Sequence, residues 1–401
     1  MDFKTLEDFD LKGKTVLLRA DLNVPAEDGR VTDTTRIDRL KPTIDFLQER
    51  GAKTMIISHF GRPKGERKEE FSLSFLSPYL ETQWGVSVAF ADDCIGTPAA
   101  EAAEGLNEGG FVLLENLRFH KGEEANDIEF ARQLAAHADI YINDAFSCAH
   151  RAHASTEAIT HILPSGTGFL MAAELNALAD ALENPERPVF AIVGGAKIST
   201  KLSVLNNMIE KVDYLCLGGG MANTFLYAQG AALGKSLYEK DMAEEARAIM
   251  KKAREKGCEI ILPLDHIIVE ELVSNAEYKE VNERNVPDTK LSVDCGSRSI
   301  SHIKDTLANC HTVLWNGPLG VFEIKPFDNG TNEVAKEVAR LTKEGKLVSV
   351  AGGGDTVSAL NNAGVADDFS YISTAGGAFL EWLEGKTLPG VAALLQSKDA
   401  A

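Results

Sequence analysis

Cationic and amide side chains recur in the first half of the chain, directly after apolar segments. They are, with one carboxylate among them, Asp21, Asn23, Arg36, His59, Arg62, Arg118 and Arg151. Guanidinium and imidazole groups are suitable partners for a phosphate or carboxylate. One arginine after an apolar segment is usually a solvated surface group. Four such positions in one region instead predict an anion-binding pocket.

In the second half of the chain, glycine clusters follow the apolar segments, and cationic residues are few there. The clusters are Gly194-Gly195-Ala196-Lys197, Gly218-Gly219-Gly220, Gly352-Gly353-Gly354-Asp355-Thr356 and Ala375-Gly376-Gly377. Glycine lets a backbone approach a ligand closely, and free N–H groups at a helix N-terminus favour phosphate. A single triple glycine is usually a plain turn. Four clusters, each before a helical pattern, predict a nucleotide site.

The common nucleotide fingerprints are absent from the sequence. The pattern GxxxxGK[ST] fails at Gly13, because Asp8 replaces the first glycine, and at Gly234, because Gln229 replaces it. No G-x-G-x-x-G follows an apolar segment. A P-loop NTPase and an ordinary dinucleotide-binding dehydrogenase are therefore disfavoured.

The elements that must position these residues alternate between strand and helix. Val-, Ile- and Leu-rich segments predict buried parallel strands at 15–24, 53–60, 111–119, 139–146, 188–195, 213–220, 259–269, 311–318 and 346–354. Amphipathic patterns predict helices between them, as at 34–51, 127–138 and 239–257, the last stopped by Gly257. Ligands of such sheets bind outside the carboxyl ends of the strands, where the unusual residues lie.

A chain of 401 residues is long enough for two domains. The order of elements predicts an α/β protein with two doubly wound, parallel-sheet (Rossmann-like) domains joined by a helical hinge. We place the N-terminal domain at 1–170, an interdomain helix at 171–185 and the C-terminal domain at 186–385. We expect the tail from about 386 to 401 to pack back on the N-terminal domain.

The composition is that of a globular protein, with 44% hydrophobic and 25% charged residues. The formal net charge of −19 argues against nucleic acid or an anionic membrane as a partner. The six cysteines show no C-x-x-C pair, which predicts buried thiols and not disulfides or a zinc site. No signal-like apolar region opens the chain and no apolar run reaches 18 residues, so we expect a cytoplasmic location without membrane contact.

Several long motifs resemble those of the phosphoglycerate kinase family, in that family's order. They are DLNVP (21–25), HFGRPKG (59–65), GGAKISTK (194–201), LGGGMANTF (217–225), WNGPLGVFE (315–323) and GGGDT (352–356). The resemblance extends from about residue 3 to residue 390. It implies a monomeric, hinge-bending glycolytic enzyme that moves a phosphoryl group between 1,3-bisphosphoglycerate and MgADP, giving 3-phosphoglycerate and MgATP.

The resemblance also implies a role for individual residues. The phosphoglycerate ligands would be Asp21, Asn23, Arg36, His59, Arg62, Arg118 and Arg151, and the catalytic residues would be Arg36, Lys197 and Gly376. The nucleotide ligands would be Gly195, Lys201, Gly219, Asn316, Pro318, Glu323, Gly352, Gly353, Gly354, Asp355 and Thr356, with Leu314 and Val321 near the adenine. Asp355 would bind Mg²⁺ and Glu323 the ribose hydroxyls.

Simpler interpretations exist for several of these residues. Lys197 and Lys201 are four residues apart, so on a helix they would share a face as a solvated pair. Asp355 could cap its helix, and this role is compatible with metal binding. His150 and His153 have the spacing of a metal pair but no recognisable third ligand, so we expect only Arg151 of this segment to bind substrate.

Two other functions remain open from the residues alone. A non-catalytic sensor could keep the fold and bind phosphorylated metabolites, but it would have no reason to keep Lys197, Arg36 and Asp355 together. Another kinase acting on a carboxylate would share the second half and differ in the first. Ala375 departs from the family, which usually has a third glycine there; we expect a negative φ at this residue, so that alanine fits.

Overall fold

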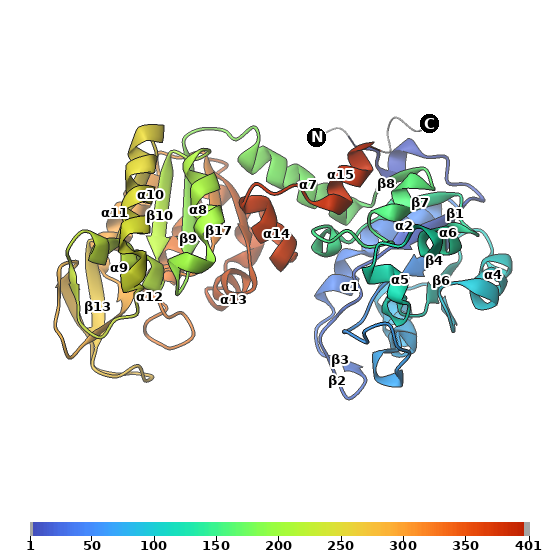
Figure 1. The fold of residues 1–401 in the computed structure, drawn as a ribbon, viewed down its shortest axis with the longest axis horizontal. Helices are drawn as coiled ribbons and strands as arrows, with labels where there is room; N and C mark the ends of the chain where they lie inside the picture. Colours follow the sequence, from blue (N-terminus) through green and yellow to red (C-terminus); the bar gives the residue numbers. More distant parts are fainter. Residues whose placement is uncertain (1–2, 397–401) are drawn as a thin grey trace. The chain divides into compact units, whose positions relative to one another are not determined.

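The computed structural model describes residues 3–396. The chain forms two compact units (Figure 1). The first contains the chain up to Asn176 together with the segment from Thr387 on, and the second is Ala177–Lys386. The division falls inside helix α7, Phe169–Leu182.

A six-stranded sheet forms the centre of the first unit. Its strands are β1 Thr15–Arg19, β4 Lys53–Ile57, β5 Val88–Ala91, β6 Phe111–Leu114, β7 Ile140–Asn143 and β8 Ser165–Thr167. The order is β5-β6-β4-β1-β7-β8, and every pair is parallel. A short hairpin, β2 Ala26–Glu27 and β3 Arg30–Val31, follows β1.

Helices and 3-10 turns surround this sheet, most of them between its strands in the chain. They are α1 Thr35–Arg39, α2 Lys41–Glu49, α3 Ser77–Trp84, α4 Gly96–Gly105, α5 Lys121–Glu124, α6 Ile128–Ala135 and α15 Pro389–Gln396, with 3-10 turns η1 Leu6–Asp8, η2 Glu69–Phe71, η3 Ser74–Leu76, η4 Leu117–Phe119, η5 Phe146–Cys148 and η6 Ala158–His161. The predicted helix at 34–51 is divided in two, because the ring of Pro42 would clash with the carbonyl of Asp38 in a continuous helix. Helix α15 packs on β8 and η6, so the C-terminal segment returns to this unit.

The second unit has a parallel sheet of the same kind. Its strands are β9 Val189–Gly194, β10 Tyr214–Gly218, β12 Glu259–Ile261, β17 Thr312–Asn316, β18 Val348–Gly352 and β19 Tyr371–Ser373. The order is β12-β10-β9-β17-β18-β19. All six residues of β9 are buried, as expected for a central strand covered on both faces.

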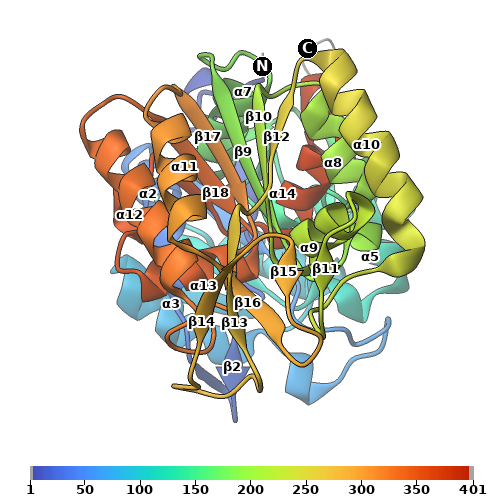
Figure 2. The ribbon, with the colours of Figure 1, turned by 90° about the vertical axis from the view of Figure 1, so that its left-hand side faces the viewer.

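Helices cover both faces of this second sheet. They are α8 Leu202–Ile209, α9 Gly219–Ala228, α10 Ala243–Lys256, α11 Ser297–Leu307, α12 Asn329–Lys343, α13 Gly354–Asn362 and α14 Gly376–Leu383, with η7 Ile198–Thr200, η8 Lys240–Met242 and η9 Ala366–Asp368. Figure 2 shows α11 and α12 on one side of the sheet and α8 and α10 on the other. Gly257 ends α10 with a φ of +76°, as the sequence predicted.

The prediction of one strand at 259–269 was wrong. The segment divides into β12 and a separate strand, β13 Asp265–Val269. Pro263 lies at the break, where it cannot donate a hydrogen bond to a neighbouring strand. Strand β13 joins an antiparallel sheet with β14 Lys279–Asn282 and β16 Leu291–Cys295, beside a small pair formed by β11 Ala232–Leu233 and β15 Asn285–Val286.

The six cysteines are all buried and unpaired, as predicted. Among the helices of residues 3–396, none combines the length and the apolar character needed to cross a bilayer.

Candidate functional site

The first unit gathers its cationic side chains at the carboxyl ends of β1, β4, β6 and β7. Arg36, at the start of α1, forms an ion pair of 3.0 Å with the buried Asp21 and donates to the carbonyl oxygen of Asn23 at 2.8 Å. The amide oxygen of Asn23 accepts the N–H of Gly61 at 3.0 Å. These contacts link the ends of β1 and β4 with the start of α1.

His59 is held by a cation that the sequence analysis did not single out. Arg19, fully buried at the end of β1, lies with Nη2 3.0 Å from Nδ1 of His59. A guanidinium group can only donate, so Nδ1 accepts and the ring proton is on Nε2. Burial and then the charges of Arg19 and Arg118 hold the pKa of His59 well below its usual value. His59 is therefore a neutral hydrogen-bond donor at physiological pH.

A buried carboxylate balances Arg19. Nε of Arg19 donates to Oγ of Ser155 at 3.0 Å, and the Ser155 hydroxyl donates to the buried carboxylate, Glu123, at 2.6 Å. Burial raises the pKa of Glu123, while Arg19 opposes that shift. An arginine within the apolar segment 15–24 was the signal in the sequence that could have identified this network.

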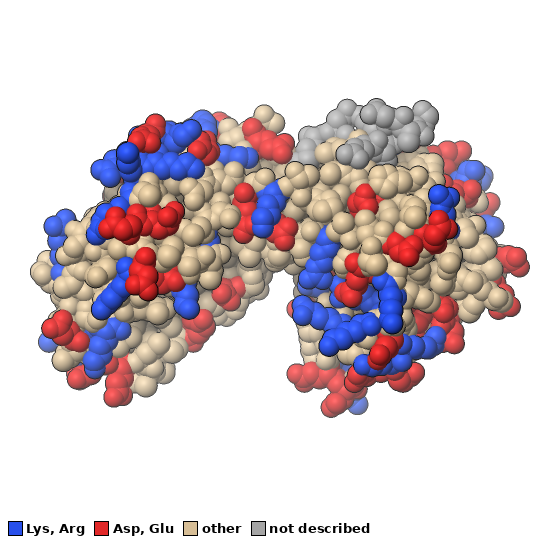
Figure 3. Space-filling model, in the orientation of Figure 1, with Lys and Arg blue, Asp and Glu red and all other residues tan. Residues whose placement is uncertain are grey.

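Arg118 belongs to the same cluster. It is buried, donates to the carbonyl oxygen of Gly61 at 2.8 Å, and contacts Glu124 at 3.3 Å. Burial lowers its pKa, and the nearby charge of Arg151 lowers it further. Arg62 and Arg151 are exposed. Figure 3 shows Lys and Arg side chains gathered on the surface of this unit over α1 and α5.

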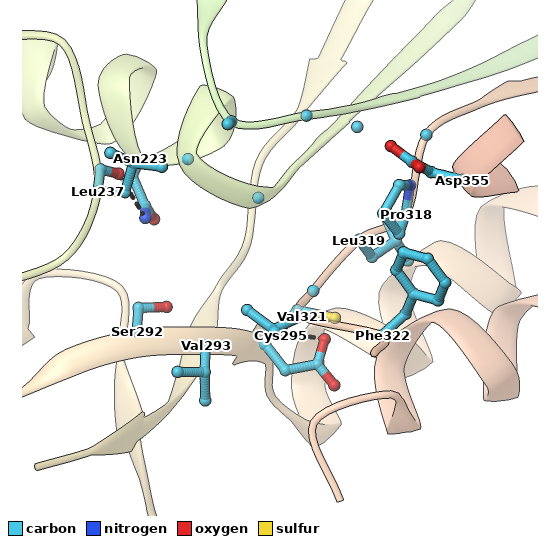
Figure 4. Close-up of a pocket in the computed structure, with 18 of the residues that line it drawn as sticks. Asn223, Leu237, Ser292, Val293, Cys295, Pro318, Leu319, Val321, Phe322 and Asp355 are labelled. Carbon is cyan, nitrogen blue, oxygen red and sulfur yellow. Dashed lines mark hydrogen bonds between the residues drawn. The ribbon is translucent and has the colours of Figure 1, made fainter. Parts of the chain in front are cut away.

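The second unit contains a cavity of about 500 Å³, a size typical of small-molecule sites. Six of the predicted nucleotide ligands line it, together with the predicted catalytic residue Lys197 and with Val321, predicted near the adenine; the six are Gly195, Lys201, Gly219, Pro318, Glu323 and Asp355. They come from loops after β9, β10, β17 and β18, which are the carboxyl ends of neighbouring strands. Figure 4 shows Asp355 and Pro318 at one end of the cavity and Asn223 and Leu237 at the other.

Lys201 is anchored at the edge of this cavity. Its Nζ donates to the carbonyl oxygen of Gly194 at 2.7 Å and to Oδ1 of Asn316 at 2.6 Å. Burial lowers its pKa to about 8, opposed by Asp355. Lys197 is exposed and lines the same cavity. The two lysines do not share a helix face, because Lys197 is extended and α8 begins only at Leu202.

Asn316 and Thr356 support the cavity and do not line it. The buried amide of Asn316 donates to the carbonyl oxygen of Gly352 at 2.8 Å, and Oγ1 of Thr356 accepts the N–H of Gly317 at 2.7 Å. A Cβ at Gly353, where φ is +98°, would lie 2.6 Å from the Asn316 amide. This close approach explains a glycine at that position.

Several other predicted residues lie outside the cavity lining. Gly352, Gly353 and Gly354 lead into α13, Gly376 begins α14, and Leu314 is buried within β17. The N-cap of α13 is Gly353 and makes no side-chain hydrogen bond, so Asp355 is not the helix cap. Its exposed carboxylate lies in the first turn of α13.

The far end of the cavity includes residues that the sequence did not point to. Asn223, His266, Ser292 and Asp294 line it. Oγ of Ser292 lies 2.8 Å from Nδ1 of His266, and Asp294 accepts the N–H of Gly330 at 2.7 Å. Burial raises the pKa of Asp294 to about 7. Asn223 comes from α9, within the motif LGGGMANTF (217–225), whereas His266, Ser292 and Asp294 come from the antiparallel sheet, which no motif indicates.

The donors of the cavity fit Mg²⁺. This cation prefers oxygen ligands and usually binds one or two carboxylates together with substrate phosphates and water. Asp355 offers an exposed carboxylate on the cavity wall, near two lysines that suit phosphate. Fold and site together define an α/β protein of the kinase class. One unit carries a cluster of cationic side chains that suits an anion, and the other carries a cavity of the size of a nucleotide.

Comparisons with known proteins identify the family. The phosphoglycerate kinase family model matches residues 6–386. A phosphoglycerate kinase of Rhodospirillum centenum is 60% identical over 98% of this chain and 100% of its own length. One of Rhizobium meliloti is 56% identical over 99% of this chain and 100% of its own length. The chain belongs to the phosphoglycerate kinase family.

Solved structures agree with this assignment. The phosphoglycerate kinase of Coxiella burnetii has a TM-score of 0.91 at 40% identity, covering 98% of this chain and 99% of its own. That of Pyrococcus horikoshii has a TM-score of 0.82 at 32% identity, covering 99% of both chains. The two parallel sheets are therefore the fold of this family.

Proposed function

We propose that this enzyme reversibly transfers a phosphoryl group from 1,3-bisphosphoglycerate to MgADP, giving 3-phosphoglycerate and MgATP, in glycolysis and gluconeogenesis. One observation carries the proposal. Anion-binding side chains occupy the strand ends of one unit, and a cavity with two lysines and a carboxylate occupies the strand ends of the other. A kinase with an anionic acceptor needs both kinds of site.

In the first unit, Asp21, Asn23, Arg36, His59, Arg62, Arg118 and Arg151 bind the phosphoglycerate. Arg36 is positioned for this by Asp21, and His59 by Arg19. The neutral His59 donates a hydrogen bond from Nε2 and adds no charge. The arginines supply the positive charge that the substrate's phosphate and carboxylate require.

In the second unit, Lys201 and the glycine-containing loops bind the nucleotide phosphates, and Glu323 binds the ribose. Asp355 holds Mg²⁺, which neutralises phosphate charge when bound. Asn316 and Thr356 keep Lys201 and the loop at Gly317 in place.

The attacking carboxylate of 3-phosphoglycerate is already an anion, so transfer from ATP requires no general base. The barrier arises because two anions must meet while a third carries the charge of the transition state. Phosphoryl transfer therefore depends on position and on electrostatic stabilisation. Lys197, Arg36 and the N-terminus of α14 at Gly376 supply this stabilisation.

Transfer in line also requires the two units to close on each other. We place the phosphoglycerate domain at 1–170, the hinge helix at 171–185 and the nucleotide domain at 186–385, with the tail at 386–396 packed against the first; the rest of the predicted tail, 397–401, lies outside the described residues. Closure excludes water and so prevents loss of the phosphoryl group to hydrolysis. We infer that the enzyme acts as a monomer, since one chain supplies both sets of ligands, and that it works in the cytoplasm, where glycolysis takes place.

A coupled assay for ATP formation from ADP and 1,3-bisphosphoglycerate tests the proposal. Turnover that requires both substrates and Mg²⁺ supports it. Binding of 3-phosphoglycerate without any ATP formation would instead indicate a sensor. Turnover with another acyl phosphate, but not with this one, would indicate a different carboxylate kinase.

A further inference from the structure

Three side chains that commonly bind metals converge in the first unit, outside the cationic cluster that contains Arg36, His59 and Arg118. They are Asp93, Cys94 and His120, and their ligand atoms all lie within 4.8 Å of one another. Asp93 and Cys94 lie between β5 and α4, and His120 follows η4, after β6. Because β5 and β6 are adjacent parallel strands, their carboxyl ends bring both loops to one edge of the sheet.

The local contacts orient the three groups toward one point. Nε2 of His120 lies 2.7 Å from Oδ1 of Asp93, and the same oxygen accepts the N–H of Cys94 at 2.7 Å. The His120 ring stacks on Phe130 at 5.1 Å between centroids, which fixes its plane. The thiol is 1% exposed, whereas the side chains of Asp93 and His120 are 32% and 28% exposed. A cation can therefore enter past the imidazole and carboxylate and meet the thiol behind them.

We propose that Asp93, Cys94 and His120 form a binding site for a thiophilic divalent cation of the Zn²⁺ class. Thiolate sulfur, imidazole nitrogen and carboxylate oxygen are the ligand types of Zn²⁺, and tetrahedral bonds of about 2.0–2.3 Å place ligand atoms roughly 3.3–3.6 Å apart. Separations of up to 4.8 Å would have to shorten by up to about 1.5 Å, and the 2.7 Å contact between His120 and Asp93 would have to lengthen, changes that side-chain rotation can supply. Solvent completes the coordination. Mg²⁺ and Ca²⁺ are poor candidates because they prefer oxygen ligands alone.

Metal binding at this site needs no reactant besides the cation. The thiol of Cys94 releases its proton to solvent, and the sulfur lone pair forms the bond to the cation. The contact between His120 and Asp93 is replaced by a bond from each to the metal. The site is independent of the proposed function, since none of its three residues contributes to the substrate clusters described above.

The charges nearby favour this cluster over the other group of possible ligands, Asp21, His59 and Cys148. In that group the Arg19 guanidinium already lies 3.0 Å from His59 and 3.5 Å from Cys148, where it opposes a cation. Arg67, beside the Asp93 cluster, instead pairs with Asp92 and lies 3.8 Å from Glu115.

A bound cation would join two loops of the first unit. His120 is two residues beyond Arg118, and its backbone N–H bonds to Leu117 at 3.1 Å. The metal would thus tie the β5–α4 loop to the segment that carries Arg118. We expect Zn²⁺ to raise the melting temperature of the chain through this link.

Metal titration of the full chain tests the site. The protein, reduced and treated with chelator, is titrated with Zn²⁺ by calorimetry and with Co²⁺ by absorbance, in buffer free of nucleotide and phosphate. We expect one tightly bound metal per chain and a thiolate-to-cobalt charge-transfer band in the near ultraviolet. Cys94→Ser should abolish the band, and His120→Gln should weaken binding at least ~10–100-fold, the loss typical of even an outer ligand partner.

Two controls make the result decisive. Cys148→Ser removes the thiol of the competing cluster, and Cys310→Ser removes a buried thiol of the second unit; both should keep the band and the melting shift. His120→Gln alters a partly exposed side chain, so it tests the site even if Cys94→Ser fails to fold. The proposal is overturned if no band forms, if His120→Gln binds Zn²⁺ as the wild type does, or if only Cys148→Ser abolishes binding.

Discussion

Two lysines four residues apart serve the candidate nucleotide cavity in different ways. Lys201 is held by Gly194 and Asn316, whereas Lys197 is exposed and lines the cavity. An anchored cation suits ground-state binding of phosphate, and an exposed one on the cavity wall suits a charge that develops during transfer. Spacing alone could not separate these roles.

Lys197→Ala should therefore lower kcat by at least roughly 10²-fold while changing the nucleotide KM little, because the lost charge acts mainly in the transition state. Steady-state kinetics with ATP and 3-phosphoglycerate measure both constants. Lys251→Ala, an exposed lysine of α10, is the control and should behave as the wild type. A large rise in KM with normal kcat would assign Lys197 to binding instead.

The charge of Lys201 depends on pH within the working range. Burial lowers its folded pKa to about 8, below the unfolded 10.5, so the free enzyme loses this cation above pH 8. We expect kcat/KM for ATP to decline above about pH 8, because kcat/KM reports groups of the free enzyme. Folding stability should change in the opposite sense: the cost of burying the charge is present below pH 8 and is relieved as pH rises toward 10.5.

Lys201→Arg tests this assignment, since arginine stays charged at every pH of the assay. The alkaline decline in kcat/KM should disappear in this variant. Lys211→Arg, a change outside the cavity lining, should keep it. If the decline persists unchanged in Lys201→Arg, another group causes it.

Arg36 and Asp21 form an ion pair, so substituting Arg36 alone also leaves Asp21 without its counter-charge. Arg36→Ala should lower kcat by about 10²-fold. It should also raise KM for 3-phosphoglycerate, because the buried carboxylate of Asp21 is left to repel the substrate. Adding Asp21→Asn should recover KM and leave kcat low. Recovery of kcat in the double variant would show that Arg36 acts only by neutralising Asp21.

At the scale of elements, the loop from β19 to α14 shows why alanine is compatible with the site. Ala375 has φ −87° and ψ 9°, so the predicted negative φ is confirmed, while Gly376 has φ +34°. The position whose positive φ favours glycine is thus Gly376. Ala375 lies before it, and its N–H donates to Oγ of Ser373 at 3.2 Å. The family's usual glycine is not required by the backbone here.

Ala375→Gly should leave kcat nearly unchanged and cost up to about 1 kcal/mol of stability through greater freedom of the unfolded chain. Gly376→Val should reduce turnover, because a branched side chain at positive φ is strained and adds bulk at the N-terminus of α14. Kinetics and urea unfolding of both variants measure these effects. A sharp gain of activity in Ala375→Gly, or a silent Gly376→Val, would contradict this account.

At the scale of the whole molecule, the two proposed substrate sites belong to different units. In-line transfer needs the reacting groups to come within about 3–3.5 Å of each other. We therefore expect small-angle scattering to show compaction with both substrates bound, and less with either alone. Lys197→Ala, which should still bind both ligands, should compact as the wild type does. An unchanged radius of gyration in the ternary complex would refute closure.

The sequence by itself determined the class of fold, and it predicted an anion pocket in the first half and a nucleotide site in the second. Alternating apolar strands and amphipathic helices admit few other arrangements, and Gly257 ends α10 as the sequence predicted. The break at Pro42, within the helix predicted at 34–51, was seen only in the structure. The nature of the ligands was predicted from arginine and glycine clusters after the apolar segments, because such clusters suit phosphate. These are local properties, encoded within short segments of the chain.

Only the tertiary structure decided which residues meet. The contacts that matter join residues between 26 and 115 positions apart in the sequence. They are Arg19 with His59, Asn316 with Lys201, and Asp93 and Cys94 with His120. Pro263 likewise separated β12 from β13, and so brought Ser292 and His266 into the cavity wall. Such contacts depend on strand order and loop path, which short-range patterns do not specify. For that reason the sequence indicated the ligands, and the structure identified the groups that hold their binding residues in place.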